Sequence, residues 1–261
     1  MRKAIIFDLD DTLLWDKKSI EESFKDTCKL ASKANTKIDP IILEERVKEK
    51  ARRLYASYPT YSFTRMIGIN PFEGLWGDFF DKGEVFEQLH KLAPDYRKST
   101  WTEALREVSV DDPYLGAELA EAFPRIRKEK AYVYKDTFDV LDQLASEFTL
   151  LLLTNGSPDL QETKLDLTPR LRSYFDAIII SGAFGKGKPD ASIFQHALDI
   201  LEVEKDKVIM VGDNLNTDIL GASRIGIDSI WINREDIENN GLPTFEVKDL
   251  SSVLALIRKG V

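Results

Sequence analysis

The chain contains little cysteine and little histidine. Its 261 residues include one cysteine, Cys28, and two histidines. A single cysteine excludes a disulfide within the chain and fits a reducing compartment, so we expect Cys28 to pack inside a helix. The histidines, His90 and His196, have no partner histidine at metal-ligand spacing. We therefore assign neither of them a role in a site.

Long apolar runs are also absent. No stretch approaches the ~20 apolar residues that a membrane-spanning helix needs. The first residues are basic and then apolar, as in a signal peptide, but Asp8, Asp10 and Asp11 interrupt that run. We expect a cytoplasmic protein with no membrane partner.

Basic residues are outnumbered by acidic ones. There are 36 lysines and arginines against 45 aspartates and glutamates, for a formal net charge of −9. This balance argues against a nucleic-acid partner, which would require a basic face. An anionic substrate would have to be attracted by a local cation or metal instead. With 43% hydrophobic and 31% charged residues, the composition is that of a folded chain with one large domain or two smaller ones.

The most informative stretch comprises residues 3–16. The apolar run from Ala4 to Phe7 has the length and composition of a buried parallel strand, and it ends at Asp8 and Asp10. Ligands of open α/β sheets bind outside the carboxyl ends of the strands. Two carboxylates this close repel each other unless a cation lies between them. The stretch therefore indicates either a metal site with a nucleophilic carboxylate or a turn whose aspartates cap a helix.

Residues 16–130 have an almost entirely helical pattern. Ser19-Ile20-Glu21-Glu22 matches a capping box at a helix start, and Asp39-Pro40 predicts the start of a second helix. Between residues 55 and 80, aromatic side chains crowd together with proline and glycine. They form either a wall over a ligand or the core of a helical domain. Further helices are expected over 84–93, 100–108 and 115–128.

From Tyr132 onward, helix and strand patterns alternate. Such alternation predicts an α/β fold, a parallel sheet with helices on both faces. We expect a core domain of residues 1–16 and 131–261, and an inserted all-helical domain of residues 17–130. The expected strands are 4–7, 148–153, 177–180, 208–211 and 229–232.

Residues suited to phosphate or metal chemistry follow four of these strands. One polar residue after one strand carries little information. Four such positions with complementary chemistry are difficult to explain as ordinary polar loop residues. They are Asp8 with Asp10, Thr154, Lys188, and Asp213 with Asp218.

These residues lie in four motifs that resemble those of the haloacid dehalogenase (HAD) superfamily, in its phosphatase branch. The resemblance implies a Rossmann-like core over about residues 1–16 and 131–235. It also places the helical insertion where the family carries a C1-type cap. The matching stretches, in the family's order, are Asp8-Leu9-Asp10-Asp11-Thr12 (DxDxT), Thr154-Asn155-Gly156, Gly185-Lys186-Gly187-Lys188-Pro189-Asp190 with Ile193-Phe194, and Gly212-Asp213-Asn214-Leu215-Asn216-Thr217-Asp218 (GDxxxxD).

The resemblance implies a role for each motif residue. Asp8 would be the nucleophile that forms an aspartyl-phosphate, and Asp10 the general acid and base. Thr154 through its hydroxyl and Asn155 through its amide would bind phosphoryl oxygens. Lys188 would neutralise the charge of the nucleophile and the phosphate.

The resemblance also implies a Mg²⁺ cofactor, because hard oxygen ligands and a phosphate suit this ion. Asp8, Asp213 and the backbone carbonyl of Asp10 would be its protein ligands. Asp218 would support the site as a partner of Lys188 or of a metal-bound water.

The function that these motifs imply is hydrolysis of a small phosphorylated metabolite, and we favour phosphoserine. Dehalogenation is disfavoured, because a carboxylate at Asp10 suits an alcohol leaving group. Sugar-phosphate or nucleotide hydrolysis and a phosphomutase are the alternative activities, and an inactive binding protein on the same fold is the non-enzymatic one. Trp15, Arg65 and Asn70 are predicted substrate contacts on position alone, and the oligomeric state is left open.

Overall fold

A computed structural model describes residues 2–261, and the chain forms two compact units. The first contains the residues up to Trp15 together with Val133–Val261, and the second is Asp16–Tyr132. We call them the sheet unit and the helical unit. No helix within residues 2–261 is long and apolar enough to cross a membrane.

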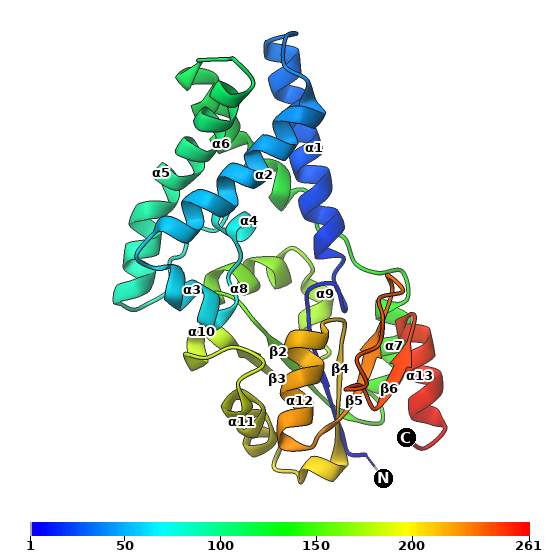
Figure 1. The fold of residues 1–261 in the computed structure, drawn as a ribbon. Helices are drawn as coiled ribbons and strands as arrows, with labels where there is room; N and C mark the ends of the chain where they lie inside the picture. Colours follow the sequence, from blue (N-terminus) through cyan, green and yellow to red (C-terminus); the bar gives the residue numbers. More distant parts are fainter. Residues whose placement is uncertain (1) are drawn as a thin grey trace. The chain divides into compact units, whose positions relative to one another are not determined.

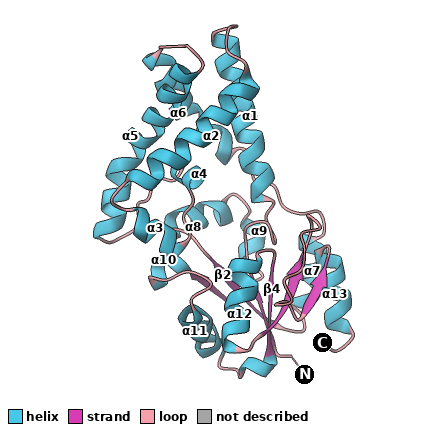
Figure 2. Ribbon diagram, viewed as in Figure 1, coloured by secondary structure: helices cyan, strands magenta, loops and turns pink. Residues whose placement is uncertain are grey.

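The sheet unit is built on six parallel strands in the order β3-β2-β1-β4-β5-β6. The strands are drawn in magenta in Figure 2. Strand β1 lies in the middle and pairs in parallel with β2 on one side and β4 on the other. The α/β prediction is therefore confirmed, and the strand order is that of a doubly wound, Rossmann-like sheet. The strands are β1 (Ala4–Phe7), β2 (Thr149–Thr154), β3 (Ala177–Ile180), β4 (Val208–Gly212), β5 (Asp228–Ile232) and β6 (Phe245–Val247).

Helices cover both faces of the sheet (Figure 1), and alternate residues of β1 belong to different buried clusters. Ile5 and Phe7 belong to a buried cluster with residues of α7 and α13. Ala4 and Ile6 belong to a second cluster with residues of α11 and α12. Because both faces are covered, the central strands β1 and β4 are apolar and buried along their whole length, as expected of a parallel sheet. The helices of this unit are α7 (Thr137–Leu144), α8 (Pro158–Asp166), α9 (Pro169–Arg172), α10 (Ser181–Phe184), α11 (Ala191–Leu201), η1 (Lys205–Lys207), η2 (Leu215–Ile219), α12 (Leu220–Ile225) and α13 (Leu250–Arg258).

The helical unit has its own aromatic core. Phe24 packs on Phe123 with ring centroids 4.7 Å apart, and Trp101 on Phe123 at 5.9 Å. Trp76 and Phe79, from the aromatic-rich stretch, are both 1% exposed, so these two rings are core residues of this unit. The helices are α1 (Asp16–Ala34), α2 (Pro40–Ser57), α3 (Tyr61–Ile67), α4 (Pro71–Gly74), α5 (Glu84–Glu107) and α6 (Pro113–Lys128).

Two local predictions differ from the structure, and two elements were not predicted. Helix α1 begins at Asp16, so Ser19 lies buried inside it and is not a cap. The two helices expected over 84–93 and 100–108 are one continuous helix that contains Pro94, because packing against α2 and α6 outweighs the local cost of proline. Strand β6 and helix α13 were not anticipated.

The single thiol is buried as expected. Cys28 is 0% exposed in α1, and burial raises the pKa of its thiol. Because the thiolate is the reactive form, we expect Cys28 to be inert in the folded protein. Titration with a thiol reagent should find no reactive thiol in the native chain and one thiol after denaturation. Rapid labelling of the native protein at neutral pH would contradict this expectation.

Candidate active site

The carboxylates of the first and fourth motifs meet where the strand order reverses. Asp8 directly follows β1 and Asp213 directly follows β4. Phe7 is in register with Val211, and the Asp8 backbone N–H donates to the Val211 carbonyl oxygen over 3.0 Å. In open α/β sheets, the crevice at this reversal is where ligands bind.

Lys188 joins the third motif to the first and the fourth. Its Nζ lies 2.6 Å from Asp8 Oδ1 and 2.7 Å from Asp218 Oδ1, and it donates to the Leu153 carbonyl oxygen over 2.7 Å. The side chains of Lys188 and Asp218 are each 1% exposed. Asp218 is also held by the Asn214 backbone N–H, which donates to its Oδ2 over 3.1 Å. The structure thus brings Lys188 together with both of its predicted carboxylate partners.

Close backbone packing surrounds this ion pair. A Cβ atom at Gly212 would collide with the carboxylate of Asp218, so glycine is required at the end of β4. The fourth motif therefore needs its glycine for space as well as its aspartates for charge.

The buried cluster contains more carboxylates than positive charges, and the pKa values of its members reflect this surplus. Burial raises the pKa of Asp8 to about 7, against the lowering effect of Lys188. Burial and the charge of Asp8 raise the pKa of Asp213 well above its usual range. Burial alone would lower the pKa of Lys188, but Asp218 and Asp8 together raise it, so this lysine stays protonated. One fixed positive charge thus faces more than one carboxylate.

A divalent cation would correct this imbalance. Oxygen atoms of Asp8, Asp213 and Asp218 lie within 4.8 Å of one another. All-oxygen donors with surplus negative charge are the ligands that Mg²⁺ prefers. The donor set therefore fits a hard divalent ion.

We expect Lys188→Met to lower the free energy of unfolding by about 3 kcal/mol, because it leaves two buried carboxylates without their counterion. Both carboxylates can take up a proton, which limits the loss. Lys186→Met is the matched control, since Lys186 is exposed and its ion pair with Asp190 is 3.5 Å long. Denaturant unfolding of both variants measures the difference, and equal midpoints would contradict the prediction.

The second motif lies beside Lys188. Thr154 ends β2, and the Asn155 side chain binds the backbone of Lys188 at both its N–H and its carbonyl. Lys188 N donates to Asn155 Oδ1 over 2.8 Å, and Asn155 Nδ2 donates to the Lys188 carbonyl over 2.9 Å. The side chain of Asn155 therefore positions the lysine loop. Because the Asn155 side chain is occupied by the Lys188 backbone, we expect the backbone N–H of Asn155 to make the predicted phosphoryl contact.

Asp10 has two neighbours that sequence reasoning missed. Lys164 Nζ lies 2.8 Å from Asp10 Oδ2, and Gln161 Nε2 donates to the same oxygen over 2.9 Å. Both come from α8, three residues apart, and therefore face the same side of that helix. The sequence shows only that both residues share one face of the helix after the second motif, and this does not by itself connect them to Asp10.

Asp213 and the loop after β1 are also anchored by residues outside the predicted set. Trp231 Nε1 donates to the Asp213 carbonyl over 2.7 Å, and Thr12 Oγ1 donates to Asp213 Oδ1 over 3.3 Å. Arg234 donates to the carbonyl oxygens of Asp11 and Thr12 over 2.6 and 3.0 Å. These contacts fix the loop that carries Asp8 and Asp10.

The three residues predicted to contact the substrate are Trp15, Arg65 and Asn70, and no hydrogen bond or ion pair described above for the carboxylate cluster involves them. Trp15 stacks on Tyr134 with ring centroids 5.2 Å apart in the sheet unit. In the helical unit, Arg65 is exposed on α3. Asn70 is the N-cap of α4, where its Oδ1 accepts from the backbone of Phe72 and Glu73. Asn70 thus has a local structural role, and substrate contact by these three residues stays a prediction.

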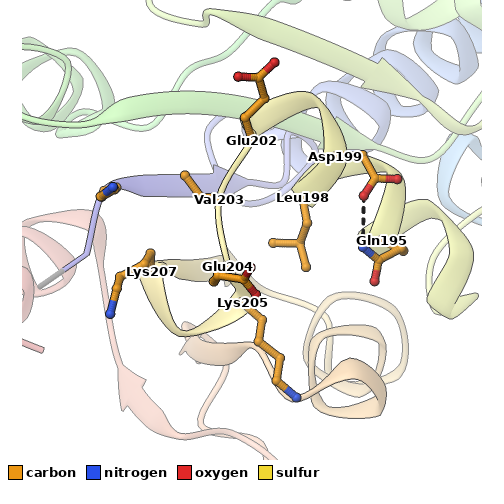
Figure 3. A pocket seen from close by; sticks show the side chains of 9 residues that line it. Gln195, Leu198, Asp199, Glu202, Val203, Glu204, Lys205 and Lys207 are labelled. Atoms are coloured by element: carbon orange, nitrogen blue, oxygen red, sulfur yellow. Dashed lines mark hydrogen bonds between the residues drawn. The ribbon is translucent and has the colours of Figure 1, made fainter.

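A separate cavity lies at the amino ends of the strands, opposite the carboxylate site. It has a volume of about 480 Å³ and is lined by residues of mixed charge, among them Lys207 before β4 (Figure 3). Lys3, which precedes β1, also lines it. Those positions mark the amino ends of the strands, whereas Asp8 and Asp213 follow the carboxyl ends. The cavity is therefore not part of the carboxylate site.

Comparison with known proteins agrees with this geometry. The model of the haloacid dehalogenase-like hydrolase family matches residues 2–226. The phosphoserine phosphatase of Thermus thermophilus is 34% identical over 255 residues, which cover 96% of this chain and 97% of that protein. The N-acylneuraminate-9-phosphatase of Mus musculus is 29% identical, over 98% of this chain and 94% of that protein. Among solved structures, YfnB of Bacillus subtilis bound to magnesium has the same fold, with a TM-score of 0.66, 20% identity and 98% coverage of both chains.

The family match spans most of the chain, and the two full-length relatives named above are phosphatases. The strand order and the grouping of Asp8, Lys188 and Asp213 are those that the four motifs led us to expect. The chain therefore belongs to the haloacid dehalogenase-like hydrolases, and within that family it is a phosphoric monoester hydrolase.

Proposed function

We propose that the chain is a Mg²⁺-dependent phosphatase that hydrolyses a small phosphorylated metabolite through an aspartyl-phosphate on Asp8. The observation that carries this proposal is the position of Asp8. Its carboxylate is buried at the switch point of the sheet, paired with Lys188 and within 4.8 Å of two further carboxylates, with Asp10 two residues along the chain.

In the first step, a carboxylate oxygen of Asp8 forms a bond to phosphorus while the bond from phosphorus to the ester oxygen breaks. Asp10 gives its proton to the departing oxygen, which leaves as an alcohol. Lys188 offsets the charge of the nucleophile and of the phosphoryl oxygens. The Thr154 hydroxyl and the Asn155 backbone amide orient the phosphoryl group by hydrogen bonds.

In the second step, Asp10, now a carboxylate, removes a proton from a water molecule as that water attacks phosphorus. The bond between phosphorus and Asp8 breaks, which releases inorganic phosphate and restores the Asp8 carboxylate. Asp10 is then protonated again and ready for the next substrate.

Asp8, Asp213 and the backbone carbonyl of Asp10 would hold the Mg²⁺ ion, with Asp218 supporting the site through Lys188. When bound, the ion supplies charge neutralisation and orientation for the phosphoryl group. The surplus of carboxylate charge around Lys188 supports this assignment.

We expect chelation to abolish activity and added Mg²⁺ to restore it, whereas Ca²⁺ should substitute poorly because it prefers more ligands and longer bonds. Binding also has a readout that needs no turnover. Mg²⁺ should raise the melting temperature of the wild-type chain, because a ligand that binds the folded state stabilises it. The Asp213→Asn variant should show no such increase at the same concentration. An equal shift in both proteins would remove Asp213 from the metal site.

Phosphoserine is the substrate that we propose first. The choice follows the full-length likeness to a phosphoserine phosphatase. A second full-length relative acts on N-acylneuraminate 9-phosphate, so a nine-carbon sugar phosphate is the second candidate. We also propose that the inserted segment, residues 17–130, acts as the cap that selects the substrate.

A phosphate-release screen over phosphorylated metabolites in the presence of Mg²⁺ tests this proposal, with Asp8→Asn as the blank. The panel should contain phosphoserine, N-acylneuraminate 9-phosphate, hexose phosphates and nucleoside monophosphates. We expect the highest kcat/KM for phosphoserine. A higher value for another compound would reassign the substrate but leave the chemistry intact, whereas no release from any compound would contradict the proposed phosphatase.

A further inference from the structure

Two side chains of α8 converge on one oxygen of Asp10. Lys164 Nζ is 2.8 Å from Oδ2, and Gln161 Nε2 donates to the same atom over 2.9 Å. Lys164 is 2% exposed and Gln161 is 0% exposed. Burying a lysine and an amide side chain is unfavourable unless both are satisfied, so their placement against Asp10 requires a compensating interaction. The Lys164 ammonium and the Gln161 NH₂ group find that interaction at Oδ2, whereas Gln161 Oε1 is buried and has no hydrogen-bond partner in the part of the chain that the structure describes.

The contacts leave the two oxygens of Asp10 unequal. Oδ2 accepts from both α8 side chains, whereas Oδ1 is buried and has no hydrogen-bond partner among residues 2–261. A buried acceptor without a donor costs free energy, so it is expected to meet a donor in the working complex. The hydroxyl of an attacking water or of a departing alcohol is such a donor. The geometry therefore separates an anchored oxygen from a reacting oxygen.

Gln161 also links Asp10 to the phosphate-binding motif. The Nε2 group has two hydrogens, and besides Asp10 Oδ2 it contacts Thr154 Oγ1 at 2.5 Å. An ionised carboxylate only accepts hydrogen bonds, which fixes the amide so that its NH₂ end faces Asp10. Thr154 Oγ1 then acts as the acceptor towards Gln161. The hydroxyl proton of Thr154 makes only a long hydrogen bond of 3.4 Å to the Asn155 carbonyl oxygen, which a phosphoryl oxygen can replace.

We propose that Gln161 and Lys164 are a pair of positioning residues, which anchor Asp10 through Oδ2 and direct its Oδ1 to the oxygen that gains or loses a proton. This inference rests on the proposed function of Asp10 and adds two residues that none of the four motifs contains. The pair acts through Asp10 and Thr154 and does not itself touch the reacting atoms.

If the pair positions Asp10, removing Gln161 or Lys164 should slow formation and hydrolysis of the phosphoenzyme to different extents, depending on the leaving group. With 4-nitrophenyl phosphate, the departing phenolate needs no proton, so formation of the phosphoenzyme does not depend on Asp10. Its hydrolysis still requires Asp10 to take a proton from water. We therefore expect Lys164→Met to release about one equivalent of nitrophenolate per chain in a fast burst, followed by slow steady-state turnover. Asp10→Asn serves as the reference for this behaviour.

For an alkyl phosphate such as phosphoserine, both steps need Asp10. Lys164→Met and Gln161→Met should therefore lower kcat by about 10- to 100-fold, part of the contribution of general acid–base catalysis, with KM roughly unchanged. Lys50→Met is the matched control, because Lys50 is also a buried lysine (6% exposed), paired with Glu107 at 2.6 Å in the helical unit. It should lose comparable stability but keep its kcat and show no burst.

The outcomes separate this inference from the function on which it rests. If the wild-type chain forms no phosphoenzyme and releases no phosphate, the proposed function fails. If the wild-type chain is active and Asp10→Asn is impaired, but both α8 variants keep wild-type kcat, the positioning role is wrong. It is also wrong if the α8 variants turn over 4-nitrophenyl phosphate slowly without a burst, or if Lys50→Met loses as much kcat as they do, because loss of stability would then account for the effect. Gln161→Met keeps the test decisive should Lys164→Met fail to fold.

Discussion

Replacing Asp8 by asparagine is expected to lower turnover by a factor on the order of 10⁴ or more, because an amide cannot form the acyl-phosphate bond. Asparagine has nearly the same shape, and it removes negative charge from a cluster that carries a surplus. The variant should therefore fold and be at least as stable as the wild-type chain in the absence of metal. Loss of activity without loss of stability would identify a chemical role and not a structural one.

The measurement combines phosphate release with a search for the covalent intermediate. Wild-type protein quenched in acid during turnover should carry one phosphoryl group on the peptide that contains Asp8, and Asp8→Asn should carry none. Asp11→Asn is the matched control. It makes the same change in charge three residues away, and asparagine tolerates the positive φ of 60° at that position. A phosphoryl group found on another residue would overturn the assignment of the nucleophile.

The second large effect is expected at Asp10. Asp10→Asn should lower kcat for an alkyl phosphate by about 10²- to 10⁴-fold, the usual range for a lost general acid and base. An asparagine at this position can still accept from Lys164 and Gln161 through its oxygen, so α8 should stay in place. The loss would then come from proton transfer and not from a displaced helix.

Steady-state kinetics with phosphoserine or the best substrate of the screen measure this effect. KM should change little, because Asp10 acts on the ester oxygen in the transition state and contributes little to ground-state binding. Activity within a factor of about two of the wild-type chain would exclude Asp10 from the proton-transfer role. Asp11→Asn again controls for the loss of one negative charge in the same loop.

Much of the fold could be read from local patterns. The strands Ala4–Phe7 and Ala177–Ile180 were predicted with their observed bounds, because a buried parallel strand is a short apolar run that ends at polar residues. The predicted helix ends were wrong where tertiary packing outweighs the local preference of a residue. Pro94 lies inside a continuous helix, and Ser19 lies inside α1 in place of capping it. Strand β6 is three residues long and only partly buried, so its apolar signal was too weak to stand out.

The site shows the same division. Asp8, Lys188 and Asp213 were identified from their positions after expected strands and from the motifs in which they lie, and the structure brings them together. Gln161 and Lys164 could not be identified in this way, because a glutamine and a lysine on a helix are ordinary surface residues until the helix is placed against Asp10. The two hydrogen bonds between the Asn155 side chain and the Lys188 backbone could not be predicted either, because they depend on how the two loops are placed in the fold.

The sequence by itself determined the α/β architecture, the family and the identity of the charged groups, since each of these depends on periodicity or on residues close together in the chain. Tertiary structure alone decided which oxygen of Asp10 is anchored and which side chains anchor it. The physical reason is that a hydrogen bond between residues far apart in the chain, such as Lys164 and Asp10, leaves no local pattern. Its geometry exists only once the strands have paired and the helices have packed upon them.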